Sequence, residues 1–575
     1  MNQQQALLFA PIYLPLLSSA LILLCKEFFT NKVRRVAEYF GMIIGMGLPL
    51  VVVFSLFGHI QTHGALETVI GSWTKEIGIV YRFDGLSLLM IVLAITITLP
   101  AWIYSRKVGP AHSSFTALLL IQNSSIAAIS MTGDLFNLFV CLEVMGVVAY
   151  VLIASNQKGG AVFATFSYLM ISSSAMVFFL LGTFSLYRLT GSLSYAGIAE
   201  SLALLGSKDK ALVAASLSLI VVPVLLRVAV MPLSLWLVDA HSRAPHAVSA
   251  ILSGVLLKIP LFALVRVLAI SELGGSIGLA ISYAGAITAL FGVLLALAQS
   301  DGKRLLAYHS ISQIGYVVSA WGLALAQGLH TSAGILLLAA SFFHAFSHAL
   351  FKALLFLSVG TATDAGASRN VYTLRGANRM LQNQGEKLPL TMICFFVGAL
   401  SITAIPPFNG YFSKTLLTYS LKGTLHYNLL TIAGVGTVAS FIKLSRIFLP
   451  SKNTIEKVDR NLRPTFPFTI HLALVILATL CLITGLFAQQ VIQCIGSVLP
   501  GKEQIIFENT FFYTAENLTK TFWTVASGIV LFFLAISKPG KRVLSVLKQL
   551  KGGFSDLFLG FAVALSALMG YLLLV

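Results

Sequence analysis

The sequence predicts an all-α protein that crosses a membrane many times. Of its 575 residues, 57% are hydrophobic and only 10% are charged, and the mean hydropathy is +0.90. Soluble domains carry about 25% charged residues. The chain also contains about 16 apolar runs that are long enough to span a bilayer as helices.

The predicted spans follow one another along the whole chain. They lie at 7–25, 37–57, 84–104, 115–131, 135–154, 161–187, 211–238, 247–272, 275–298, 304–326, 332–359, 388–423, 427–449, 466–498, 519–536 and 556–575. The run at 7–25 lacks the basic start and the cleavage site of a signal peptide, so we expect it to be a membrane helix.

The basic residues favour a topology and argue against nucleic acid. The net charge is +18, but the Lys and Arg residues lie between apolar runs and do not cluster as a binding groove would require. If the N-terminus is outside, the inside loops carry most of these residues, among them Arg34, Arg243, Lys303 and Lys541, which satisfies the positive-inside rule. Both termini are therefore predicted to lie outside.

The sequence predicts no cofactor. Five cysteines are scattered singly, without a CxxC pair, metal-ligand spacing or disulfide framework. There is no Walker or dinucleotide-binding glycine pattern, so we expect neither nucleotide nor redox chemistry in this chain.

Two spans contain helix breakers. Pro223 and Pro232 bracket the seventh span, and Pro406-Pro407 with Asn409-Gly410 interrupt the twelfth. Each proline removes a backbone hydrogen bond, and such breaks occur in membranes where the freed groups line a polar cavity. Two broken helices five spans apart are typical of repeated halves in transporters.

The eleventh span carries three ionisable residues, His344, His348 and Lys352, in the run SFFHAFSHALFKALLFLSV. Four residues advance a helix by about 400° and roughly 6 Å, so the three side chains share one face. Charged groups in hydrocarbon are costly unless they face a bundle interior or water. The row favours a proton path. Buried, hydrogen-bonded histidines with a snorkelling lysine are the alternative, and a zinc site lacks a third ligand.

Further ionisable residues occur within other spans. Glu143 is the one acidic residue in the middle of a span. The candidate basic partners are Arg227, Lys258, Lys352 and Lys414. A desolvated lysine can release its proton, whereas arginine cannot, so Arg227 is interpreted as a fixed charge. His309, four residues before Gln313, could help to order water between Lys258 and His344.

Five ordered motifs resemble the antiporter-like subunits of respiratory complex I, Mrp-type cation/proton antiporters and membrane-bound hydrogenases. They are DLFNLFVCLEV, PLSLWLVDAHSRAPHAVSAILSGVLLKIP, DGKRLLAYHSISQIGY, FFHAFSHALFKALLFLSVG and IPPFNGYFSK. The wording of two of them resembles the Mrp D-type subunit most. The resemblance implies a 14-helix core of two inverted five-helix units, each a half-channel with a broken helix.

The resemblance also implies roles for individual residues. Glu143 would match the family's glutamate, Arg227 its broken-helix lysine and Lys258 the lysine of the next helix. His344, His348 and Lys352 would match the central relay, and Lys414 the terminal lysine. The chain departs from the family at Arg227, at Ser167 before Tyr168 and at Ser234, where lysine, lysine and histidine are usual. The first half-channel is therefore expected to be electrostatically altered or to carry a different ion.

The sequence predicts a proton-translocating subunit, with or without sodium exchange, of a multisubunit complex in the cell membrane. Other membrane subunits and lipids are the expected partners. One alternative is a largely structural subunit of a redox complex with a non-pumping first half-channel, and another is a transporter of an organic solute. The predicted segments are N-terminal helices at 1–110, half-channel units at 111–272 and 273–450, a last core helix at 451–498 and a two-helix extension at 499–575.

Overall fold

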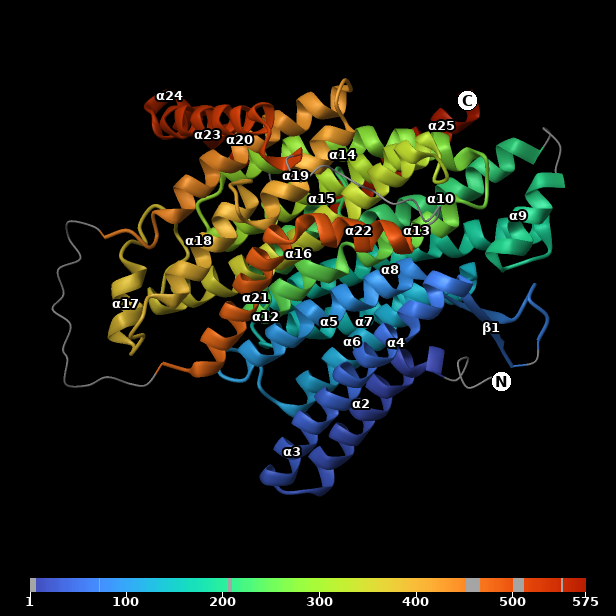
Figure 1. The fold of residues 1–575 in the computed structure, drawn as a ribbon, viewed down its shortest axis with the longest axis horizontal. Helices are drawn as coiled ribbons and strands as arrows, with labels where there is room; N and C mark the ends of the chain where they lie inside the picture. Colours follow the sequence, from blue (N-terminus) through green and yellow to red (C-terminus); the bar gives the residue numbers. More distant parts are fainter. Residues whose placement is uncertain (1–6, 72, 205–208, 451–465, 500–510, 550–551) are drawn as a thin grey trace.

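The computed structural model describes residues 7–71, 73–204, 209–450, 466–499, 511–549 and 552–575, and it is almost entirely helical (Figure 1). Within these residues, fourteen helices are long and apolar enough to cross a membrane. The two remaining predicted spans, at 304–326 and 388–423, are the more polar helix α15 (Gly302–Gln327) and the broken pair α18 (Leu390–Ile402) and α19 (Asn409–Ser420). The predicted fold class is confirmed.

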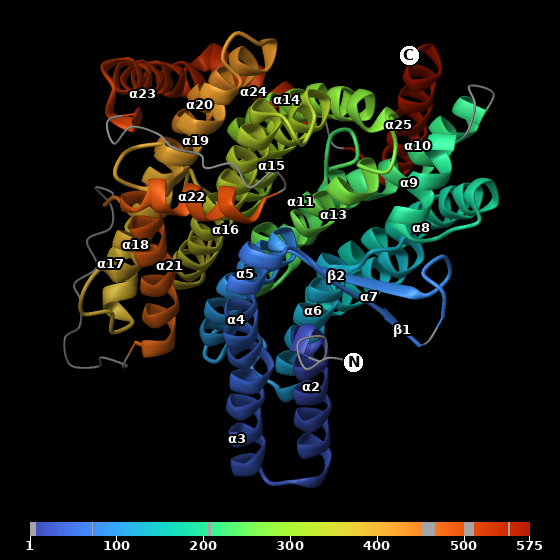
Figure 2. The same cartoon turned by 45° about the vertical axis from the view of Figure 1, so that its right-hand side comes forward.

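The N-terminal part forms a helical hairpin that projects from the body of the molecule (Figure 2). A short antiparallel β-hairpin separates its second arm from the next helix. The elements are α2 (Ala10–Phe28), α3 (Asn31–Met42), the π-helix η1 (Ile43–Gly47), α4 (Leu48–His63), β1 (Leu66–Ile70), β2 (Ile79–Phe83) and α5 (Gly85–Ser105).

The next helices are interrupted at two places, residues 229–234 and residues 252–258. The elements are α6 (Ser113–Met131), α7 (Leu135–Ala154), α8 (Gly159–Thr190), α9 (Tyr195–Leu204), α10 (Lys210–Val228), α11 (Leu235–Arg243), α12 (His246–Ile251), the π-helix η3 (Leu252–Leu256) and α13 (Ile259–Leu268). The side chain of Asp134 accepts hydrogen bonds from the main-chain N–H groups of Asn137 and Val80, so it caps α7 and ties it to β2.

The following group surrounds the longest helix of the described chain, α16. The elements are α14 (Leu273–Ala298), α15, α16 (Ser332–Ala365), α17 (Ala377–Asn383), α18, α19 and α20 (Leu425–Ser445). Helices α14 and α15 press together at glycines. A Cβ atom on Gly285 would lie only 2.5 Å from the main-chain nitrogen of Ser319, and one on Gly292 only 2.6 Å from that of Ser312. Small residues thus allow close approach of the α14 and α15 backbones, and α15 also packs on α16.

Both predicted helix breaks are present and share a backbone feature. Helix α10 ends at Val228 and is followed by Ala229 with φ of 62°, whereas α18 ends at Ile402 and is followed shortly by Ala404 with φ of 59°. Alanine rarely adopts this left-handed conformation, because its Cβ crowds the backbone there. The surrounding structure therefore holds both breaks in place.

The eighth span differs from the continuous helix that the sequence predicts. It passes from α12 through the π-helix η3, and Lys258 stands between η3 and α13. Pro260 near the start of α13 cannot donate a main-chain hydrogen bond, which explains an interruption just before it. The consequence is that Lys258 lies at a break in its helix.

The C-terminal elements extend across the rest of the bundle. They are α21 (Phe468–Leu486), α22 (Ala488–Val498), the 3-10 turn η4 (Phe511–Tyr513), α23 (Ala515–Ile536), α24 (Lys538–Gln549) and α25 (Phe554–Leu574). Helix α23 packs on α20, α24 on α14, and α25 on α10. Residues 451–465 and 500–510, which begin the fourth and fifth predicted segments, lie outside the described residues.

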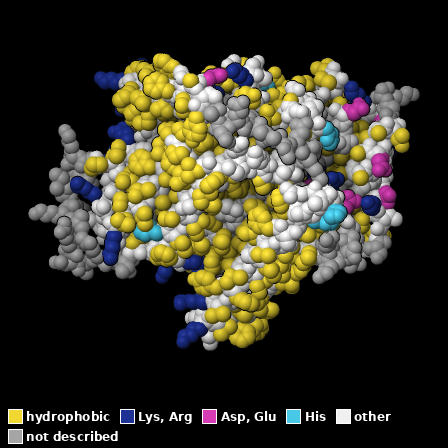
Figure 3. All heavy atoms as spheres, viewed as in Figure 1, with side chains coloured by type: hydrophobic (Ala, Val, Ile, Leu, Met, Phe, Trp, Pro, Cys, Tyr) yellow, Lys and Arg dark blue, Asp and Glu magenta, His cyan; other side chains and the backbone are white. Residues whose placement is uncertain are grey.

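Hydrophobic side chains dominate the face shown in Figure 3, and Lys and Arg side chains lie toward its edges. On α7, the exposed residues include Val140, Val147 and Val151, and on α23 they include Trp523 and Phe533. An apolar surface with charges at its margins is the arrangement that a lipid bilayer requires.

Candidate functional site

Helix α16 is the buried axis of the site. His344, His348 and Lys352 are each fully buried in it. The two imidazole rings lie nearly parallel, with centroids 6.5 Å apart and an angle of 16° between their planes. The predicted single face of ionisable groups is therefore present in the structure.

Lys352 finds its partners on α15 and on its own helix. Its Nζ donates to the main-chain carbonyl of Leu306 and lies 4.6 Å from the ring centroid of Phe356. A carbonyl and an aromatic face stabilise a cation but provide no counter-charge. The ring of His241 stacks on the ring of Phe356, and the two ring centroids are 4.8 Å apart.

Lys258 lies at the break in its own span, between η3 and α13. Its Nζ donates to the carbonyl oxygen of Ser253 in η3. The hydroxyl groups of Ser253 and Ser310 are 2.8 Å apart, which connects this span to α15. The amine is fully buried. Lys258 thus satisfies a backbone carbonyl that the irregular helix leaves available.

Lys414 lies on α19, the helix that follows the break after α18. Its Nζ donates to the carbonyl oxygen of Ile402, the last residue of α18, at 2.7 Å. It also lies 5.0 Å from the ring centroid of Tyr316. The residue before it, Ser413, has its Oγ 3.1 Å from Nδ1 of His344.

These residues form a series that we name the central row, namely Lys258, His348, Lys352, His344 and Lys414. Within the described part of the chain, no carboxylate forms an ion pair with any of its three lysines; main-chain carbonyls accept from all of them. Moreover, both nitrogens of His348 and Nε2 of His344 have no protein partner among the described residues. Buried polar groups of this kind are usually satisfied by internal water.

Glu143 and Arg227 form an ion pair between α7 and α10. Arg227 also donates to the carbonyl oxygen of Leu142 at 2.9 Å and is 2% exposed. Gly146 leaves room for the guanidinium, since a Cβ there would lie 2.7 Å from Nη1. The side chain of Glu143 is 27% exposed, so this carboxylate lies on the bundle's outer face and is less buried than its position in the span indicates.

Aromatic residues lie close to the Glu143–Arg227 pair. Tyr168 stacks on Trp236 with a centroid distance of 3.7 Å and meets Tyr150 edge-on at 4.8 Å. The indole of Trp236 donates to the carbonyl of Leu226, the residue before Arg227, at 2.9 Å. These contacts connect α7, α8, α10 and α11 near the pair.

The role that the sequence predicts for His309, ordering water between Lys258 and His344, stays a prediction. Nε2 of His309 is 2.5 Å from Oγ of Ser440 on α20, and its ring packs on Phe441. The next residue, Ser310, makes the link to η3. His309 therefore contacts α20, whereas its neighbour Ser310 contacts the span that contains Lys258.

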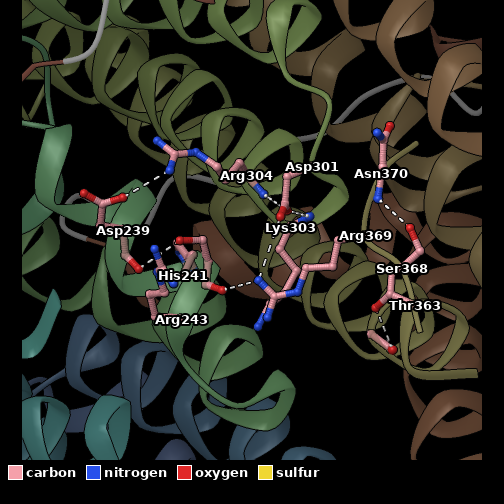
Figure 4. A network of polar contacts seen from close by, with 12 residues as sticks. Asp239, His241, Arg243, Asp301, Lys303, Arg304, Thr363, Ser368, Arg369 and Asn370 are labelled. Carbon is pink, nitrogen blue, oxygen red and sulfur yellow. Dashed lines mark hydrogen bonds and ion pairs between the residues drawn. The ribbon is translucent and has the colours of Figure 1, made fainter. Parts of the chain in front are cut away.

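The structure adds buried cations that the sequence analysis assigns to loops or leaves aside. Lys303 is 1% exposed and donates to the carbonyl of Ala244 at 2.6 Å, near His241 and Arg243 (Figure 4). Lys443 is 4% exposed and donates to the carbonyl of Leu297 at 2.6 Å. For Lys303, the available signal was its place directly before the predicted span at 304–326.

A polar cavity of about 430 Å³ opens beside Lys303. His246 and Asp364 meet in it, with Nε2 and Oδ2 3.1 Å apart. Both nitrogens of His241 are buried without a protein partner among the described residues. His241 stacks on Phe356, the ring that Lys352 contacts, and Arg243 and Ala244 just after it line the cavity, so this residue lies close to both the cavity and Lys352.

The fold and this interior define a polytopic membrane protein built around a buried chain of ionisable side chains. The model of the family described as NADH:quinone oxidoreductase/Mrp antiporter, TM, matches residues 132–443, and the chain belongs to this family. The predicted family is thereby confirmed.

The chain is similar to subunits of different complexes. It is 32% identical over 447 residues to the N-type subunit of the NADH-quinone oxidoreductase of Desulforudis audaxviator, covering 74% of this chain and 85% of that protein. It is 27% identical over 503 residues to the D-type subunit of the Na(+)/H(+) antiporter of Alkalihalophilus pseudofirmus, covering 85% and 95%. A chain of the Mrp complex from Dietzia sp. DQ12-45-1b shares the fold, with a TM-score of 0.73, 22% identity and coverage of 95% and 100%.

Proposed function

We propose that this chain is a proton-translocating subunit of a multisubunit membrane complex, moving protons alone or in exchange for sodium. The observation that carries the proposal is the central row, in which three buried lysines donate to main-chain carbonyls and have no ion-pair partner among the described residues. A lysine without a counter-ion can exchange its proton, whereas a lysine in a fixed ion pair holds it.

Protons would enter through the polar cavity beside Lys303 and reach His241. From there they would pass to Lys352 and Lys258, then through His348 and His344 toward Lys414. Hydrogen-bonded side chains cover the last step, from His344 to Ser413 beside Lys414. The unpartnered imidazole nitrogens provide places for bridging water.

Charge on one lysine would repel charge on the next, since like charges close together in a low-dielectric interior interact strongly. The charge of Lys258 acts on Lys352, so a proton at either amine opposes a proton at the other. Proton movement at one end of the central row would therefore change occupancy further along it. Glu143 and Arg227 would set the potential near α10 as a fixed pair.

The proposed topology places both termini outside, in the cell membrane. It rests on the excess of Lys and Arg in alternate loops. We also propose the boundaries 111–272 and 273–450 for the two half-channel units, because each range contains one helix break with an alanine in the left-handed conformation. Other membrane subunits and lipids would cover the exposed apolar faces.

The test is proton movement in inverted membrane vesicles that contain the full complex, followed with a pH-sensitive dye. Lys352→Ala should reduce transport at least tenfold while the protein still assembles, because it removes the middle amine of the row. Lys541→Ala on α24, which removes an exposed lysine, is the matched control and should transport normally. Near-normal transport by the Lys352→Ala variant would refute the proposal.

The Glu143–Arg227 pair favours a second candidate, a largely structural subunit whose first half-channel does not conduct. Arginine stays protonated at any accessible pH, so that pair cannot relay a proton through Arg227. Mass spectrometry of the proteins that co-purify in mild detergent distinguishes the two kinds of complex. Small membrane subunits alone indicate an ion-driven antiporter, and iron–sulfur subunits indicate a redox complex.

A further inference from the structure

Helix α23 lies beyond the residues that match the family, yet it contributes to a cavity at the second helix break. The cavity has a volume of about 60 Å³ and is lined by Lys414, Tyr316 and Ala404 from the core and by Asn517, Lys520 and Thr524 from α23. A buried water needs roughly 10–15 Å³ of such volume. The cavity can therefore hold a few water molecules next to the amine of Lys414.

The polar residues of α23 are arranged as a stripe. Asn517, Lys520, Thr521 and Thr524 recur at intervals of three or four residues, so they share one face of the helix. The opposite side carries exposed apolar residues such as Trp523 and Val530. A polar stripe on a membrane helix turns toward a polar interior, and here it turns toward the cavity with Lys414.

Lys520 is the only charged side chain that α23 places on the cavity within the described residues, and it is half-buried. Its Nζ lies 4.3 Å from the ring centroid of Tyr427 on α20. One turn earlier, Glu516 pairs with Lys422 at 2.7 Å, and both side chains are exposed. The rim therefore holds an exposed ion pair, and the interior holds two amines and the phenol of Tyr316.

We propose that α23 completes the mouth through which protons leave the central row, with water as the acceptor and Lys520 as a positioning charge. This inference rests on the proposed function, and the predicted topology places the mouth outside. The N–H bond of protonated Lys414 breaks, its proton goes to a water molecule in the cavity, and a neutral amine remains. The cation of Lys520 repels the returning proton and so favours release.

The first experiment measures whether water reaches the cavity. In a background where the exposed Cys494 is replaced by serine, Thr524→Cys should react with a charged, membrane-impermeant thiol reagent added from outside. Val530→Cys, on the lipid-facing side of the same helix, is the matched control and should react at least tenfold more slowly. Equal rates for the two variants would overturn the proposal.

The second experiment measures proton transport by the full complex against outside pH. Lys520→Met should slow transport several-fold and shift its pH profile, and Lys520→Arg should restore both, because it keeps the charge. The groups that face Lys520 are Lys414, Tyr316, Tyr427, Glu516 and Lys422, and all are unchanged in these variants. Lys541→Met on α24 should match the parent chain.

The outcomes separate this inference from the proposed function. If Lys352→Ala abolishes transport but Lys520→Met matches the parent in rate and pH profile, then the role of α23 is wrong and the proposed function stands. If Lys352→Ala transports normally, then the proposed function fails, whatever Lys520→Met does. A Lys520→Arg variant that fails to rescue would contradict the charge-based role.

Discussion

Nδ1 of His344 and Oγ of Ser413 lie 3.1 Å apart and join the central helix α16 to α19, one residue before Lys414. This contact carries a direct path of polar atoms from the histidines to the second helix break. It connects the buried histidines of α16 to the helix that follows the second break. The ring of Tyr316 lies beside both ends of the path, 5.7 Å from that of His344 and 5.0 Å from Nζ of Lys414.

Ser413→Ala should therefore slow proton transport several-fold without preventing assembly, because it removes the hydroxyl between His344 and Lys414. Ser413→Thr keeps the hydroxyl and should retain most of the activity. Ser445→Ala, which removes a hydroxyl that bonds within α20, serves as the control. If Ser413→Ala transports at the parent rate, protons do not use this contact.

Arg227→Lys should change the pH dependence of transport. Lysine can titrate where arginine cannot, and it would face Glu143 in place of the guanidinium. The measurement is the transport rate in vesicles across a neutral to alkaline pH series, compared with that of the parent chain. An unchanged rate and pH profile would mean that the first half-channel is not limited by this arginine.

Glu38→Gln should destabilise the N-terminal hairpin strongly. Glu38 is 3% exposed, lies 2.5 Å from Arg106 and accepts a hydrogen bond from Ser113 at 2.6 Å. Breaking a buried ion pair typically costs about 3–5 kcal/mol. Thermal unfolding in detergent should show a clear decrease in Tm.

The matched control for this prediction is Glu27→Gln. Glu27 pairs with Lys26 at 3.1 Å, but its side chain is 66% exposed, and an exposed pair contributes less than about 1 kcal/mol. The two variants remove the same charge. Equal losses of Tm would show that the Glu38–Arg106 pair contributes no more than a surface pair.

Gly285→Ala should separate α14 from α15. The new Cβ would lie 2.5 Å from the nitrogen of Ser319 and 3.0 Å from the carbonyl oxygen of Gly315, so backbone must move. Overpacking of this kind costs about 1–3 kcal/mol. Gly58→Ala is the control, since nothing lies within 4 Å of its Cβ, and alanine favours a helix by up to about 1 kcal/mol. Thermal stability should fall for the first and hold for the second.

The membrane spans could be predicted from the sequence because length and hydropathy are local properties of the chain. Pro232 and Pro406-Pro407 likewise lie in the two helix breaks that the sequence predicts, whereas Pro223 lies inside the continuous helix α10. The interruption at Lys258 was missed, although Pro260 was the local sign of it. A single proline near a span's middle is compatible with either a kink or a break, and the neighbouring helices decide.

The partners of the site residues could not be predicted in the same way. Lys258, Lys352 and Lys414 donate to main-chain carbonyls, which the side-chain pattern does not reveal. Lys303 and Lys443 are buried because other helices cover them. Counting the charges in each loop cannot predict this, because it contains no information on which helices pack together. Glu143 was found by its place in a span, but its partial exposure depends on which face of α7 turns outward.

The C-terminal helices α23, α24 and α25 connect the two predicted half-channel units. Helix α23 rests on α20 of the second predicted unit, α24 lies along α14, and α25 rests on α10 of the first. A transporter that rocks one half against the other would have to break the contacts of α23 with α20 or of α25 with α10 in every cycle. The packing of the tail on both predicted units therefore favours a mechanism in which the helices keep their places and protons pass between fixed side chains.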